Sequence, residues 1–313
     1  MNTKPNIMNK ILVSPSSFGQ ISNEPYEILE KEGYEVIKNP YGRKLTENEV
    51  IELASECIGI VAGVEPLTRS VIEQLPKLRC ISRVGVGMDS VDLDFARTQE
   101  IQVVNTPDGP TRSVAEMTIG MIFSILRRIP QAHANIINDI WKKETGNLLF
   151  GKKIGIVGLG RIGKMVAEFL IAIGNEVMGY DIYPDLGWAK KNRVAIVSLD
   201  TIFEKSDIVS LHLPPDKSGL HIINGRLLRK MKQSAFLVNA ARGGVVDELE
   251  LQYMLETKAI AGAAIDVFSE EPYHGPLIKL DNVVLTPHLG SYAAEGKLQM
   301  EIDSVNNLIE NLK

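Results

Sequence analysis

The sequence is poor in the features that mark secreted, nucleic-acid-binding and membrane proteins. Its 313 residues include only two cysteines, Cys57 and Cys80, and both fall in runs that predict buried strands, so we expect free thiols in a reducing compartment. The net charge is −5 without any basic run, which argues against nucleic-acid or anionic-membrane binding. The most apolar run, residues 117–126, is too short to span a bilayer, and residues 1–10 are too polar for a secretory signal. We therefore expect a cytoplasmic protein, whose arginines can hold a small anionic substrate whatever the net charge.

Short apolar runs alternate with amphipathic stretches along the whole chain, a pattern typical of an α/β fold with parallel sheets. The first third holds enough strands for an independent doubly wound sheet of the flavodoxin-like kind, and a second series of strands follows it. We expect strands at 11–14, 34–38, 57–63, 79–85 and 101–105, and then from 153 and at 176–180, 194–198, 207–213, 235–241, 261–267 and 282–287. Helices are expected around 24–32, 46–56, 68–75, 91–99, 112–128 and 292–312.

The helix at 112–128 is apolar nearly all round, which predicts burial between elements or between subunits. Ser113 and Glu116 have the spacing of a capping box, so we expect the helix to begin beside them.

The stretch GIVGLGRIG carries the pattern of a dinucleotide-binding turn, with Gly158, Gly160 and Gly163 between a strand and a helix. The first glycine permits the tight turn, the second lets a pyrophosphate approach the backbone, and the third lets the helix pack closely on the sheet. The amides of Arg161 and Ile162 are then expected to point at the phosphates from the helix N-terminus.

An acidic residue follows at the spacing that this turn requires. Asp181 lies 23 residues after Gly158, at the end of the next expected strand, where a carboxylate can bind the adenosine ribose hydroxyls. The same carboxylate would repel a 2′-phosphate, so we predict NAD rather than NADP. The alternative is that Asp181 only shapes the turn before Pro184.

Three polar residues stand after expected strands in the second half: Arg242, Glu271 and His288. In open α/β sheets ligands bind beyond the carboxyl ends of the strands. Hydride transfer to or from a hydroxyl carbon needs a group that exchanges the hydroxyl proton near neutral pH, which suits histidine. A carboxylate can hold its other ring nitrogen, and arginine can grip a substrate carboxylate. Taken singly, each residue is better explained as a capping arginine, a solvated glutamate or a loop histidine.

The chain as a whole resembles the NAD-dependent D-isomer-specific 2-hydroxyacid dehydrogenases, in the branch similar to D-3-phosphoglycerate dehydrogenase. The resemblance rests on motifs that keep the family's order and spacing: RVGVGMDSVDL (83–93), VNTPDGPTRSVAE (104–116), GIVGLGRIG (155–163), NAARGGVVDE (239–248), AAIDVFSEEP (263–272) and TPHLGS (286–291). It implies that Arg242 orients the substrate carboxylate and carbonyl, that His288 is the acid/base, and that Glu271 is its partner. It also implies cofactor contacts by Asp266, at the nicotinamide carboxamide, and by His212, Pro214, Ala240 and Gly290.

The resemblance also points to a substrate loop at RVGVG. We expect the amides of Val84, Gly85, Val86 and Gly87 to converge on a carboxylate, since glycines permit such an anion-binding nest, although a plain strand end is the alternative. Arg83 would hold a distal acidic group of the substrate.

One departure from the branch lies at Pro110, where an Asn is common. Proline has no amide donor, so a polar substrate contact is lost there, and phosphoglycerate itself is in doubt.

The late position of the glycine turn predicts that the cofactor domain is inserted into another α/β domain. We expect a Rossmann dinucleotide-binding domain over 108–290 and a flavodoxin-like substrate domain formed by 1–107 and 291–313. The helix at 112–128 and the resemblance predict a homodimer. No metal site and no appended regulatory domain are expected.

The leading hypothesis is an NAD-dependent dehydrogenase for a D-2-hydroxy acid and its 2-keto acid. An NAD-sensing binding protein, like the transcriptional corepressors built on this fold, is the alternative from another class. A formate-type dehydrogenase is disfavoured because that branch pairs its histidine with glutamine, whereas Glu271 stands here. The natural substrate, the physiological direction and the exact oligomer stay open.

Overall fold

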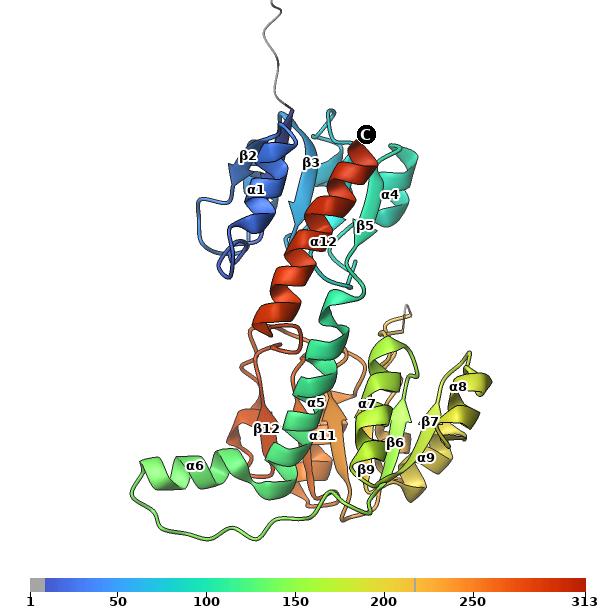
Figure 1. Cartoon of the computed structure of the whole chain (residues 1–313). Coiled ribbons are helices and arrows are strands. Elements are labelled where there is room, and N and C mark those ends of the chain that lie inside the picture. Colours follow the sequence, from blue (N-terminus) through green and yellow to red (C-terminus); the bar gives the residue numbers. More distant parts are fainter. Residues whose placement is uncertain (1–8, 217) are drawn as a thin grey trace, which may run out of the picture. The chain divides into compact units, whose positions relative to one another are not determined.

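The computed structural model describes residues 9–216 and 218–313 (Figure 1). Residues 1–8, where the sequence predicts no secretory signal, lie outside the described residues. The chain forms two compact units: unit 1 comprises Met1–Pro110 together with Ser291–Lys313, and unit 2 comprises Thr111–Gly290. Unit 2 is thus an insertion between two parts of unit 1. Both are α/β units with a parallel sheet, as the alternating pattern of the sequence predicts.

Unit 1 holds a five-stranded parallel sheet with the strand order β2-β1-β3-β4-β5, the flavodoxin-like order. Its elements are β1 (Lys10–Val13), α1 (Glu24–Lys31), β2 (Glu35–Lys38), α2 (Glu47–Ala54), β3 (Cys57–Ala62), α3 (Arg69–Ile72), β4 (Cys80–Arg83), α4 (Leu93–Thr98), β5 (Gln102–Asn105) and α12 (Ala294–Leu312). The predicted fold class is therefore confirmed for this unit.

Helices cover both faces of this sheet. α12, red in Figure 1, packs on β3, β4, β5 and α1, and it buries Val305, Leu308 and Ile309 against residues of β1. α2, α3 and α4 close the opposite face over a second apolar cluster. Both cysteines lie in the core, where burial raises the pKa of the Cys57 thiol to about 11 and that of Cys80 to about 12. They are inert, as expected for small buried apolar residues.

Unit 2 holds a seven-stranded parallel sheet with the order β12-β11-β10-β9-β6-β7-β8. Counted from β6, this is the Rossmann order with one further strand at its edge. Its elements begin with α5 (Gly109–Arg127), whose first two residues belong to unit 1. The others are α6 (Ile129–Ile137), β6 (Lys153–Val157), α7 (Arg161–Ala172), β7 (Glu176–Tyr180), α8 (Leu186–Lys191), β8 (Ala195–Ile196), α9 (Leu199–Lys205), β9 (Ile208–Leu211), α10 (Gly225–Leu228), β10 (Phe236–Asn239), α11 (Glu248–Glu256), β11 (Gly262–Ile265), the 3₁₀ helix η1 (Pro276–Lys279) and β12 (Val283–Leu285).

Two apolar clusters fill the two faces of this sheet. One contains side chains of α5 and α7, such as Ile122 and Leu170, and the other contains side chains of α9, α10 and α11, such as Phe203 and Leu251. No helix among the described residues is long and apolar enough to cross a membrane.

The region around α5 differs from expectation in two ways. The helix begins at Gly109, so Ser113 lies inside it, and Glu116 pairs instead with Arg112 at 2.7 Å. The predicted capping box is therefore wrong. A second helix, α6, was not foreseen; it starts after Arg128, whose left-handed backbone (φ 53°) turns the chain away from α5.

Candidate functional site

The glycine turn of unit 2 leaves an open space above the backbone where α7 begins. Gly158 has φ 94°, and a Cβ there would lie 2.3 Å from the carbonyl oxygen of His212. A Cβ on Gly163 would lie 1.9 Å from the carbonyl oxygen of Gly158. At Gly160, the N-cap of α7, a Cβ would meet nothing within 4 Å. Gly158 and Gly163 therefore permit close packing of strand, turn and helix, while Gly160 leaves an open space that fits a pyrophosphate.

Asp181 lies directly after β7 and is tied to the glycine turn. Its Oδ2 accepts a hydrogen bond from the amide of Leu159 at 2.7 Å, and its Oδ1 accepts one from the amide of Tyr183 at 2.9 Å. The second bond shows that Asp181 also shapes its own turn. A carboxylate has lone pairs for further donors, so the expected contact with ribose hydroxyls stays a prediction.

His212 lies after β9 and lines the glycine turn from the other side. Its Nε2 is 2.9 Å from Ser210 Oγ, while its Nδ1 is buried without a hydrogen-bond partner among the described residues. Burial lowers the pKa of His212 to about 4, so the imidazole is neutral at pH 7. Ala240 is buried after β10, whereas Pro214 is exposed. Their expected cofactor contacts are not tested by these positions.

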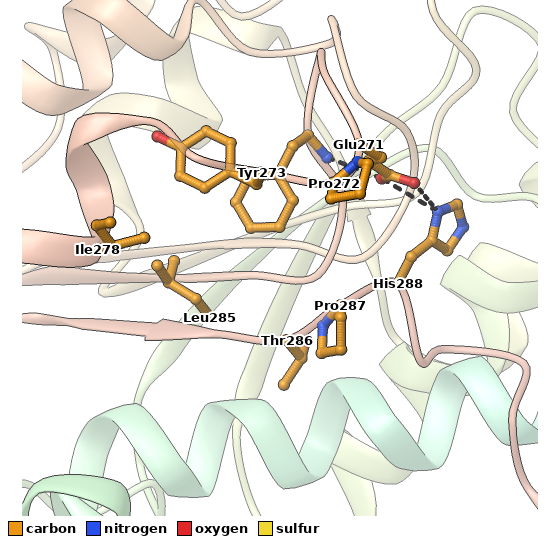
Figure 2. A pocket seen from close by; sticks show the side chains of 9 residues that line it. Glu271, Pro272, Tyr273, Ile278, Leu285, Thr286, Pro287 and His288 are labelled. Atoms are coloured by element: carbon orange, nitrogen blue, oxygen red, sulfur yellow. Dashed lines mark hydrogen bonds and ion pairs between the residues drawn. The ribbon is translucent and has the colours of Figure 1, made fainter.

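The structure brings Glu271 and His288 together. His288 Nδ1 lies 3.1 Å from Glu271 Oε1 and 2.9 Å from Oε2, and Figure 2 shows the carboxylate facing the ring. Both side chains are partly exposed, at 46% for His288 and 37% for Glu271. The carboxylate thus holds Nδ1 and leaves Nε2 free to face a substrate, which is the arrangement that an acid/base histidine needs.

Asp266 braces the turn that carries His288. Its Oδ1 accepts hydrogen bonds from Thr286 Oγ1 at 2.6 Å and from the Leu289 amide at 2.8 Å, and its Oδ2 accepts one from the Gly290 amide at 2.9 Å. His288 has left-handed backbone (φ 56°), a conformation that a side-chain-bearing residue keeps only where the surroundings hold it. Sequence reasoning missed this bracing role of Asp266 and Thr286. The contact of Asp266 with a nicotinamide carboxamide stays a prediction.

Arg242 lies in a turn after β10 that a buried asparagine holds. Asn239, 3% exposed, accepts a hydrogen bond from the Ala241 amide at 3.1 Å and donates one to the Arg242 carbonyl at 3.2 Å. The guanidinium donates to the Ala241 carbonyl at 2.7 Å. The sequence contains a signal for Asn239, an asparagine at a strand end, but nothing in the pattern specifies its two bonds.

The RVGVG loop belongs to unit 1, and half of its predicted nest is already occupied. The Val84 amide donates to the Ala62 carbonyl at 2.9 Å, and the Gly85 amide donates to Thr106 Oγ1 at 2.8 Å. The prediction that four successive amides converge on a carboxylate is therefore wrong for these two. The amides of Val86 and Gly87 remain as candidates.

Two residues from β5 and its end hold this loop. Thr106, 1% exposed, binds the Gly85 amide, and Asn105 donates to the Val86 carbonyl at 2.8 Å. Arg83 folds back and donates through Nη1 to the Val84 carbonyl.

A cavity of about 550 Å³ adjoins the Glu271/His288 pair within unit 2. Its walls are mostly apolar, and Phe268 and Tyr273 stack there with ring centroids 4.1 Å apart. Ile278 and Leu285 also line this cavity (Figure 2). Within 9–216 and 218–313 no group of three or more histidine, cysteine or acidic residues could hold a metal ion.

Comparisons with known proteins agree with the geometry. The model of the "D-isomer specific 2-hydroxyacid dehydrogenase, NAD binding domain" matches residues 119–290. A glyoxylate reductase of Thermofilum pendens is 42% identical over 260 residues, covering 80% of this chain and 76% of that protein. A hydroxypyruvate reductase of Thermotoga maritima is 34% identical over 303 residues, covering 93% and 97%.

Longer relatives match as well. A D-3-phosphoglycerate dehydrogenase of Methanocaldococcus jannaschii is 39% identical over 258 residues, covering 81% of this chain but 49% of that protein. The chain thus spans about half the length of that relative. Among solved structures, the TT0316 protein of Thermus thermophilus has a TM-score of 0.89 at 30% identity, covering 97% of this chain and 96% of that one. On these matches, with the glycine turn and the Glu271/His288 pair in place, the chain belongs to the D-isomer specific 2-hydroxyacid dehydrogenase family, and unit 2 is its NAD(P)-binding domain.

Proposed function

We propose that the protein is an NAD-dependent oxidoreductase that transfers a hydride between nicotinamide and a D-2-hydroxy acid/2-keto acid pair. The observation that carries the proposal is the Glu271/His288 pair, with His288 Nδ1 held by a carboxylate and Nε2 left for a substrate. It lies in the same unit as the glycine cradle that fits a dinucleotide. An acid/base group beside a hydride carrier is the minimum that this chemistry requires.

The residues of the chain divide the work as follows. Bound nicotinamide supplies or accepts the hydride at the substrate carbon. In the reductive direction His288 Nε2 gives a proton to the forming alkoxide, and Glu271 stabilises the imidazolium through Nδ1. Arg242 holds the substrate carboxylate with paired hydrogen bonds. In unit 1 the amides of Val86 and Gly87 are candidate donors to an anion. In the oxidative direction the same histidine removes the hydroxyl proton.

The preference for NAD over NADP rests on Asp181 and its surroundings. The carboxylate would repel a 2′-phosphate, and residues 182–187 contain no lysine or arginine that could bind one. The nearby cation of Lys164 is paired with Asp185 at 2.7 Å. We therefore expect NADH to be the better substrate by at least tenfold in kcat/KM, or about 1.4 kcal/mol.

The substrate is proposed as a short 2-keto acid or its D-2-hydroxy acid, with a phosphoglycerate-like acid as the longer alternative. The names of the relatives span both groups, and Pro110, buried at the start of α5, offers no amide donor to a distal polar group. NADH oxidation at 340 nm over glyoxylate, pyruvate, hydroxypyruvate and 3-phosphohydroxypyruvate separates them. His288→Asn, which tolerates the left-handed backbone, should abolish turnover and keep NADH binding.

Failure would be plain in this assay. A wild-type protein that binds NADH but oxidises it with none of these acids would favour the NAD-sensing alternative. A His288→Asn variant that keeps wild-type turnover would overturn the acid/base assignment.

We further propose that the protein is a homodimer. α6 and the residues after it expose a group of large apolar side chains: Ile136, Ile137, Trp141, Leu148 and Phe150. Exposed apolar groups of this size mark association surfaces. Light scattering should report twice the chain mass of 34.5 kDa. The double variant Trp141→Glu/Phe150→Glu should have the mass of a single chain. A monomeric wild-type protein would contradict the proposal.

A further inference from the structure

The segment that carries Arg242 and the segment that carries Glu271 touch each other at two points. At the first point, a Cβ on Gly243 would lie 1.9 Å from the Phe268 carbonyl oxygen, so the two backbones are in direct contact. At the second point, Glu248 Oε1 accepts hydrogen bonds from the amide of Ser269 at 2.6 Å and from its hydroxyl at 2.8 Å. Residues 242–248 therefore grip residues 268–269 from two sides.

The backbone that carries Glu248 is held in place by hydrogen bonds and burial. It is the first residue of α11, whose N-cap Asp247 accepts a hydrogen bond from the Glu250 amide at 3.1 Å. The preceding Val245 and Val246 are buried, and the backbone there pairs with Ile223 on both sides. The carboxylate thus projects from a fixed helix start rather than from a free loop.

The contact passes directly to the acid/base pair. Phe268, next to Ser269, donates its amide to Glu271 Oε1 at 3.1 Å, and the same oxygen lies 3.1 Å from His288 Nδ1. The Glu271 side chain is more than a third exposed, so packing alone does not select its rotamer. Its place beside the imidazole depends on where the Phe268 amide stands.

We propose that Glu248 is a positioning residue for the Glu271/His288 pair, acting through Ser269. It holds the loop 268–271 so that Glu271 faces Nδ1, and it couples that loop to the segment bearing Arg242. This inference rests on the proposed function. Glu248 touches neither substrate nor cofactor in this role; its effect is carried by the loop.

The test compares Glu248→Ala with Glu250→Ala in the full chain. Both glutamates lie in the first turn of α11, so each substitution removes one negative charge near the same end of the helix dipole. Glu250, however, pairs with Arg229 at 2.6 Å and not with the loop. For Glu248→Ala we expect kcat with the best keto acid to fall roughly tenfold, with the Kd for NADH unchanged. In this reduction the alkaline limb of the pH profile should also move to lower pH, because the protonated imidazole that gives the proton loses the carboxylate that stabilises it.

Two further variants separate positioning from simple loss of stability. Glu248→Gln keeps an acceptor oxygen and should restore most of the activity and the pH profile, while Glu250→Ala should match the wild type throughout. Ser269→Ala removes only the hydroxyl bond to Glu248, so its effect should be smaller. The effects of Ser269→Ala and Glu248→Ala should not add, since both substitutions disrupt the same contact. A Glu248→Ala enzyme with wild-type kcat and pH profile would overturn the inference and leave the proposed function intact.

If the wild-type protein turns over none of the acids, the proposed function fails, and the positioning role of Glu248 is then tested without substrate. The imidazole N–H proton of His288, identified by its loss in His288→Asn, is then followed by NMR. It should weaken in Glu248→Ala and persist in Glu250→Ala. A signal that is the same in both variants would refute the positioning role.

Discussion

The glycine turn supports a prediction in which two similar substitutions differ in their effect on stability. Gly160→Ala adds a methyl group that meets nothing within 4 Å, and the backbone there (φ −71°, ψ −164°) is open to alanine. The weaker helix cap costs about 0.5–1 kcal/mol, and the lower entropy of the unfolded chain offsets about 0.4–1 kcal/mol. We therefore expect almost no change in the free energy of unfolding.

Gly163→Ala is different because its methyl group has no room. Its Cβ would lie 1.9 Å from the Gly158 carbonyl oxygen, about 1.4 Å closer than an ordinary carbon–oxygen contact of about 3.3 Å. The obstacle is backbone, so the turn or α7 must shift. Overpacking of this kind costs about 1–3 kcal/mol, which lowers Tm by about 2–4 °C for each kcal/mol in a unit of this size.

Binding of NADH should be impaired in both variants. In Gly160→Ala the methyl group fills the cradle, and we expect the Kd to rise at least tenfold, or about 1.4 kcal/mol. The assay is a fluorescence titration of NADH beside a thermal melt of each protein. Wild-type affinity in Gly160→Ala would refute a pyrophosphate over this turn, and wild-type Tm in Gly163→Ala would refute the packing account of the third glycine.

Three further predictions concern the rest of the site. Asp181→Ala should narrow the ratio of kcat/KM between NADH and NADPH at least fivefold by removing the repulsive carboxylate; an unchanged ratio would speak against its ribose role. His212 titrates near 6.5 in the unfolded chain but at about 4 when folded, so between these values only the unfolded state binds the proton. Stability should hold above pH 6.5 and fall as pH drops towards 4, and melts of His212→Gln should show a shallower fall; equal slopes would contradict this. Thr106→Val frees the Gly85 amide and should raise KM for the keto acid several-fold at constant NADH affinity, so an unaltered KM would argue against bracing of the substrate loop.

The sequence predicted the elements wherever a regular apolar pattern determines them. The strands of both sheets and the helix α12 lie where the alternation placed them, because buried faces enforce their period. The sequence did not predict α6 because the break before it depends on the left-handed backbone of Arg128, and arginine is not a residue type that indicates this conformation.

For the site, residue type and strand-end position singled out Glu271 and His288, and the family resemblance paired them, but neither predicted the residues that support the pair. The side chains of Asp266 and Asn239 accept hydrogen bonds from backbone amides of neighbouring turns. Such bonds depend on three-dimensional placement rather than on spacing in the sequence. The occupied amide of Gly85 was missed for the same reason, since Thr106 approaches it from another strand.

The route of the chain through the two units also has a consequence for synthesis on the ribosome. The core of unit 1 groups Ile11 and Val13 of β1 with Leu308 and Leu312 of α12, which are translated after all of Thr111–Gly290. All residues of unit 2 are synthesised before the last residues of unit 1, so the inserted unit can fold first. Until α12 is made, one face of the unit 1 sheet stays uncovered. The nascent chain therefore exposes that apolar face for the time needed to translate unit 2, which is the interval in which a chaperone that binds apolar segments would act.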